Sequence, residues 1–80
     1  MARASRYDDE RKRILGLVHS ADLAHGRPPS VRDLARATDV GVATMHSYLK
    51  RLAGEGLIEW APGRHRSLRV TPAGLVEITA

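Results

Sequence analysis

The sequence predicts a small, mainly α-helical domain with one β-hairpin, and three observations support this fold class. Apolar residues recur at helical spacing in three separate segments before residue 54. After residue 56, two short runs of strand-forming residues flank the turn pair Pro62-Gly63. The chain has 80 residues, which suits one small domain, and no stretch approaches the roughly 18 to 20 apolar residues of a membrane span.

The first predicted helix has Asp8 as its N-cap and runs to about Leu23. Two further acidic residues fall in its first turn, where the helix dipole favours negative charge. Its inward face is formed by apolar residues at helical spacing, namely Ile14, Leu17, Val18 and Ala21. Gly26 and the two prolines that follow end this helix. Residues 1–6 are predicted to be a flexible basic arm.

Ser30 is predicted to cap a short second helix, because Asp33 follows three residues later in a variant of the capping box. The inward face of this helix consists of Val31, Leu34 and Ala35. Residues 38–41 are predicted to form a tight turn. Within it Asp39 tolerates the left-handed backbone conformation, and Gly41 serves as the N-cap of the next helix.

The third predicted helix spans about Val42 to Ala53. Its buried stripe lies at i, i+4 and i+7 and consists of Met45, Leu49 and Leu52. Beyond two closing glycines, residues 57–60 and 67–70 are predicted strands on either side of a loop. Thr71-Pro72 is typical of an N-cap followed by proline, which predicts a short final helix over residues 73–78.

These elements in this order predict a winged helix-turn-helix, with three helices plus a two- or three-stranded wing. Residues 7–70 form the predicted domain and residues 71–80 a C-terminal extension. In such a domain the second helix of the helix-turn-helix enters the major groove of DNA. The net charge of +4 and the eleven arginines agree with a polyanionic partner. A GC-rich genome would also produce this composition, so charge alone does not establish DNA binding.

The same residues resemble the DNA-binding domain of the LexA-type SOS repressors. The resemblance rests on Gly26-Arg-Pro-Pro-Ser-Val-Arg-Asp-Leu-Ala35, on Tyr48-Leu-Lys-Arg-Leu52 followed by Gly56-Leu-Ile-Glu59, and on Gly63-Arg-His-Arg-Ser-Leu-Arg-Val70. It covers about residues 7–70. Thr38-Asp39 stands where the family usually has Leu-Gly. The family's second domain, with its Ser-Lys catalytic pair and dimer contacts, has no counterpart in these 80 residues, so we do not expect self-cleavage.

The outward face of the third helix is predicted to read DNA. Val42 and Ala43 are expected to touch thymine methyl groups, whereas His46 and Ser47 are expected to form hydrogen bonds with bases. The residues expected to hold phosphates and set the register are Ser30, Arg32, Thr44, Lys50 and Arg51. A solvated helix face, and for Ser30 a simple cap, are the alternatives.

The predicted wing tip carries Arg64, His65 and Arg66, which are expected to reach the DNA backbone or an A·T-rich minor groove. The alternative is an exposed basic hairpin without a partner. Trp60 and Tyr48 are assigned to core or rim packing, with phosphate contact as the alternative for Tyr48.

Enzymatic activity is not expected, because the sequence has no nucleophile elbow, glycine-rich phosphate loop or paired-carboxylate motif. No cofactor is expected, and no metal site either, because the chain has no cysteine and its four histidines do not share one helix face. The basic N-terminus has no apolar signal region behind it, so a cytoplasmic, nucleoid-associated location is expected.

We therefore expect sequence-specific binding of double-stranded DNA by a small transcriptional repressor. One alternative is an architectural or accessory factor in recombination or replication, and another is a winged-helix module for protein–protein interaction. A single module of this size buries only about 600 to 1,000 Å² on DNA. A homodimer or cooperative assembly on DNA is therefore expected, without a membrane partner.

Overall fold

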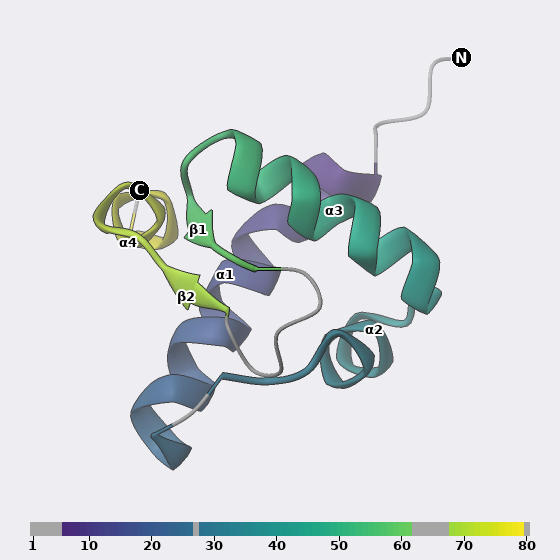
Figure 1. Cartoon of the computed structure of the whole chain (residues 1–80), viewed down its shortest axis with the longest axis horizontal. Helices are drawn as coiled ribbons and strands as arrows, with labels where there is room; N and C mark the ends of the chain where they lie inside the picture. Colours follow the sequence, from purple (N-terminus) through teal and green to yellow (C-terminus); the bar gives the residue numbers. More distant parts are fainter. Residues whose placement is uncertain (1–5, 27, 62–67, 80) are drawn as a thin grey trace.

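The computed structural model describes residues 6–26, 28–61 and 68–79. In chain order its elements are α1 (Arg6–His25), α2 (Val31–Thr38), α3 (Val42–Gly54), β1 (Ile58–Glu59), β2 (Arg69–Val70) and α4 (Pro72–Thr79). The two strands are antiparallel, with Ile58 opposite Val70 and Glu59 opposite Arg69. Figure 1 shows the hairpin between α3 and α4, with α2 beside the N-terminal end of α3. This arrangement confirms the mainly helical winged fold.

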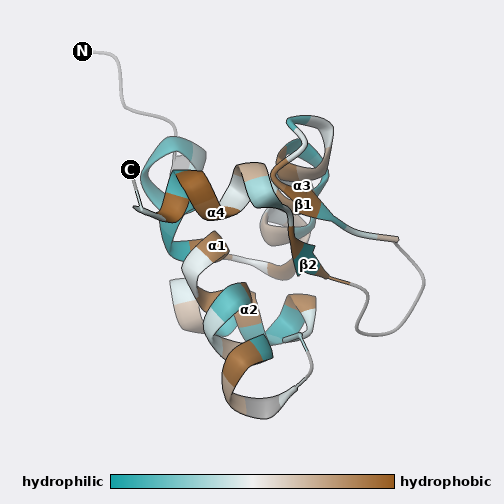
Figure 2. Ribbon diagram, turned by 90° about the vertical axis from the view of Figure 1, so that its left-hand side faces the viewer, coloured by the Kyte–Doolittle hydropathy of each residue, from teal (hydrophilic) through white to brown (hydrophobic). Residues whose placement is uncertain are grey.

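The hydrophobic core lies between the first three helices and the hairpin. The predicted stripe of α3 is fully enclosed, since Met45, Leu49 and Leu52 are each 0% exposed. The same core cluster includes the buried side chains of Ile14, Leu15, Val18, Leu34, Leu57, Ile58 and Leu68. The ribbons of the helices alternate hydrophobic and hydrophilic stretches (Figure 2), as expected for helices that bury one face.

Helix α1 is longer at both ends than the sequence predicted. It begins at Arg6, so the prediction of Asp8 as N-cap is wrong, and this residue lies in the first helical turn. The physical reason is the burial of Tyr7, which is 2% exposed and lies in phase with the buried face of α1 when the helix includes it. The predicted end at Gly26 is confirmed, because this glycine has a φ of 69° and its N–H donates to the Asp22 carbonyl at 2.8 Å.

The turn between α2 and α3 follows the predicted local chemistry. The Asp33 N–H donates to Ser30 Oγ at 3.0 Å, and the Ser30 N–H donates to Asp33 Oδ2 at 3.1 Å, which confirms the capping box. Asp39 adopts the left-handed conformation, with φ 58° and ψ 42°. Gly41 is the N-cap of α3, as predicted. This turn therefore sets the direction in which α3 leaves α2.

The C-terminal residues form a helix, α4, that packs on α1 and β2. The predicted N-cap is confirmed, because Thr71 Oγ1 accepts a hydrogen bond from the Gly74 N–H at 3.1 Å. The same hydroxyl donates to the Gly56 carbonyl at 2.6 Å. A Cβ atom at Gly74 would collide with the Leu57 carbonyl oxygen, so a glycine allows α4 to approach the start of β1.

The strands are shorter than predicted, because β1 and β2 hold two residues each. Residues 62–67, which include most of the predicted loop over residues 61–66, lie outside the described part of the chain. No helix in the described segments has the length and apolar character needed to cross a membrane.

Candidate nucleic-acid interface

Helix α3 presents all four predicted base-reading residues to solvent. Val42, Ala43, His46 and Ser47 are exposed, whereas the stripe on the other side of the helix is buried. Val42 is 48% exposed although it is apolar. An exposed apolar side chain in the first turn of such a helix is suited to contact a thymine methyl group. The structure therefore gathers these residues on one accessible surface.

The exposed surface of α3 has a centre and two flanks, because about 3.6 residues complete a helical turn. Ala43, Ser47 and Lys50 lie opposite the buried stripe and form the centre. One flank faces the hairpin, since the His46 ring contacts the ring of Trp60 just after β1, at a centroid distance of 4.7 Å. The other flank faces α1, where Tyr48 meets Tyr7 edge to face.

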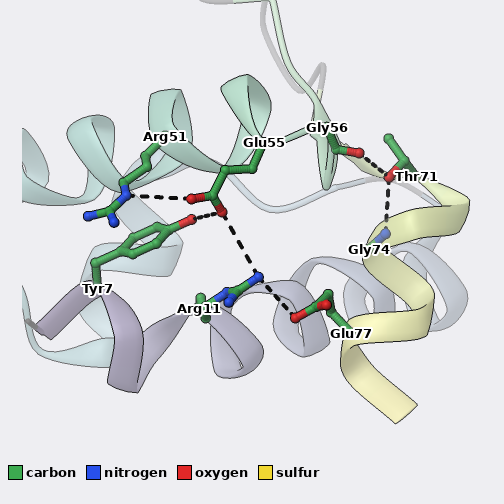
Figure 3. Close-up of polar contacts among 8 residues, drawn as sticks. All are labelled: Tyr7, Arg11, Arg51, Glu55, Gly56, Thr71, Gly74 and Glu77. Carbon is green, nitrogen blue, oxygen red and sulfur yellow. Dashed lines mark hydrogen bonds and ion pairs between the residues drawn. The ribbon is translucent and has the colours of Figure 1, made fainter. Parts of the chain in front are cut away.

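Arg51, a predicted phosphate ligand, lies on the flank beside α1. Its guanidinium carbon is 4.1 Å from the centroid of the Tyr7 ring, in cation–π geometry. Its Nε lies 3.6 Å from Oε2 of Glu55, the C-cap residue just after α3 (Figure 3). The side chain is still 55% exposed, so it stays accessible to a phosphate. Its role at a phosphate stays a prediction, and the structure adds that its position is fixed by two intramolecular contacts.

A polar network ties the C-terminal end of α3 to α1 and α4 (Figure 3). Tyr7 Oη donates to Glu55 Oε1 at 2.6 Å. Arg11 Nη2 lies 4.0 Å from the same oxygen and 2.9 Å from Glu77 Oε1. Burial, and secondly the hydrogen bond to the Glu55 carboxylate, raise the pKa of the Tyr7 phenol well above its ordinary value. This network holds one end of the exposed helix in place.

The sequence reasoning missed Tyr7, although a signal for it exists. Tyr7 stands seven residues before Ile14 and is therefore in phase with the buried stripe of α1. Tyr48 and Trp60, for which the sequence predicts packing, are half-buried and pack against the core. Trp60 has a second contact that the sequence did not reveal, namely the ring of His46.

The remaining predicted phosphate ligands lie at the starts of α2 and α3. Ser30 is half-buried and its hydroxyl serves the capping box, which confirms the cap, while a phosphate contact stays a prediction. Arg32 and Thr44 are exposed in the first turns of their helices. Backbone N–H groups at such helix starts favour anions.

The predicted wing residues Arg64, His65 and Arg66 lie outside the described residues. The two paired strands are described, and Arg69 on β2 is exposed opposite Glu59 on β1. Across residues 6–26, 28–61 and 68–79, no three His, Asp or Glu side chains gather as metal ligands would.

Comparison with known proteins agrees with this geometry. The model of the LexA DNA binding domain family matches residues 8–67. The LexA repressor of Limosilactobacillus fermentum is 36% identical over 63 residues, which are 78% of this chain and 30% of that repressor. The LexA repressor of Enterococcus faecalis is 33% identical over 76 residues, or 94% of this chain and 36% of that protein. The chain thus spans about a third of the length of these curated relatives.

Proposed function

Because the chain belongs to the LexA DNA-binding domain family, we propose that it binds double-stranded DNA sequence-specifically and represses transcription by occupying promoter DNA. The observation that carries this proposal is the exposed surface of α3, on which Val42, Ala43, His46 and Ser47 lie together above a fully buried stripe. A helix held in this way can enter a major groove without exposing the core.

The side chains at the centre of that surface suit base reading. Ala43 and, at the tip of α3, Val42 offer methyl groups to thymine, and Ser47 offers a hydroxyl that can donate or accept. His46 offers a ring nitrogen to a base edge from the flank that faces the hairpin. Lys50, one turn after Ser47, is positioned for a phosphate at the groove edge.

The phosphate contacts would come from both ends of the helix-turn-helix. Arg32 and the capped start of α2 are proposed to contact one strand of the DNA, and Thr44 and Arg51 lie on the flank of α3 beside α1. The Arg51 side chain loses little additional conformational entropy on binding DNA, because Tyr7 and Glu55 already hold it. The wing arginines, Arg64 and Arg66, are proposed to add backbone or minor-groove contacts.

Two copies on adjacent half-sites, or cooperative binding along DNA, would supply the affinity that one module lacks. A protein acting in this way works at the nucleoid. The alternative is an architectural or accessory protein that binds DNA during recombination or replication. Such a protein would select no preferred sequence from a random duplex library.

The experiment that tests the proposal is selection of bound duplexes from a random library at about physiological salt, followed by sequencing. Ser47→Ala should change the preferred bases, whereas the matched control Ser20→Ala, an exposed serine of α1, should leave them unchanged. An inverted repeat would show a dimer on two half-sites. No enrichment by the wild-type protein would overturn the proposal.

A further inference from the structure

Trp60 lies where the hairpin meets the exposed surface of α3. It is the single tryptophan of the chain and directly follows β1. Its side chain is half-buried and packs against the hydrophobic core, so the core fixes the position of the indole. The indole ring also meets the His46 ring edge to face, with centroids 4.7 Å apart and an angle of 70° between the planes.

His46 would otherwise be a mobile side chain on an exposed helix surface. Its neighbour in the same base-reading set, Ser47, is also exposed but is short, so its reach is limited. A contact between two aromatic rings in this geometry favours one rotamer about twofold to tenfold. The indole is anchored on a different element from α3, and it therefore holds the imidazole toward the hairpin side of the helix.

We propose that Trp60 is a positioning residue for base recognition. It holds the His46 ring so that His46 reads the base at one defined position of the DNA site. This inference rests on the proposed function, because His46 must face DNA for its orientation to matter. In this arrangement Trp60 acts through His46, and the base preference at one position of the site depends on a residue outside the recognition helix.

A purely structural role for Trp60 predicts a different result. Loss of core packing would weaken binding to all duplexes by the same factor, because a less stable domain is folded less of the time. Loss of the His46 orientation would instead change the ranking of bases at one position and leave the other positions as they were. The base-by-base preference is therefore the readout that separates the two roles.

The test compares base preferences of the wild type with those of Trp60→Leu, Trp60→Phe and His46→Ala. Trp60→Leu should reduce the discrimination between best and second-best base by about threefold or more, at the position that His46→Ala also affects. Trp60→Phe should retain the preference, because a ring remains beside His46. In the double variant, Trp60→Leu should add no further change at that position, as expected for residues acting as one unit.

Several results would overturn the inference. An enriched wild-type consensus that Trp60→Leu leaves unchanged, or weakens equally at all positions, would refute it while the proposed function stands. A wild type without any preferred sequence would refute both.

If Trp60→Leu does not fold, NMR spectroscopy of the wild type tests the inference instead. The ring current of the indole should displace the chemical shifts of the His46 ring protons from their random-coil values, in the free protein and in the complex with the selected duplex. Loss of that shift on DNA binding would show that His46 leaves Trp60 to contact DNA, and the inference would fail.

Discussion

Removal of the Tyr7 hydroxyl is a direct test of how the C-terminal end of α3 is held. Tyr7→Phe keeps the buried ring, its contact with Tyr48 and the cation–π contact with Arg51. It deletes the 2.6 Å hydrogen bond that the phenol donates to Glu55. The change in stability therefore reports mainly on the loss of the phenol hydroxyl.

The expected loss is about 1.5 kcal/mol, the lower end of the range for a hydrogen bond to a charged group. The lower end applies because the Glu55 side chain is 38% exposed, so water can replace the phenol. Its carboxylate also keeps Arg51 and Arg11 within 4.0 Å. For a domain of this size the melting temperature should fall by about 6 to 12 °C.

The same hydrogen bond has a pH signature. The pKa of Tyr7 is raised in the folded protein by burial and by Glu55, so above the ordinary tyrosine pKa of about 10 the unfolded chain loses this proton and the folded protein keeps it. Its stabilisation is complete below that pH and is lost as the pH rises. By pH 11 the wild type should lose about 1.4 kcal/mol through this group, and Tyr7→Phe should not.

Urea unfolding at pH 8 and pH 11, followed by circular dichroism, measures both effects. The wild type should exceed Tyr7→Phe by about 1.5 kcal/mol at pH 8 and by nearly nothing at pH 11. The matched control is Tyr48→Phe, which removes a hydroxyl from the half-buried partner ring and should change stability by less than about 0.5 kcal/mol. A difference between wild type and Tyr7→Phe that is the same at both pH values would refute the reasoning.

Two further predictions concern α4 and the phosphate contacts. Gly74→Ala should lower the free energy of unfolding by about 1 to 3 kcal/mol, because the new methyl group meets the Leu57 carbonyl. Gly16→Ala, within α1 and with open space at its Cβ, should instead raise it by about 0.5 to 1 kcal/mol, and urea unfolding that ranks them otherwise would contradict the packing argument. Lys50→Ala and Arg51→Ala should each flatten the plot of log affinity against log salt by about 0.9. If Lys50→Ala flattens this plot and Arg51→Ala does not, Arg51 stays with its intramolecular partners when the protein binds DNA.

The sequence predicted the elements whose signals lie within a few residues. The capping box at Ser30, the left-handed Asp39 and the buried stripe beginning at Met45 are all confirmed. Caps and turns depend on residues up to four positions apart, and helical periodicity depends on residues up to seven positions apart. Both can therefore be recognised along the chain. The boundary at Asp8 was wrong because burial of Tyr7, a tertiary effect, extended the helix past the local capping signal.

The sequence by itself therefore determined the order of the elements, the buried side of α3 and which residues of that helix face outward. The tertiary structure decided how those outward residues are held: Tyr7 meets Glu55 across 48 positions, and Trp60, which follows β1, meets His46 on α3. The physical reason is that such contacts depend on how the helices and the hairpin pack on the shared core, which no local pattern of residues encodes.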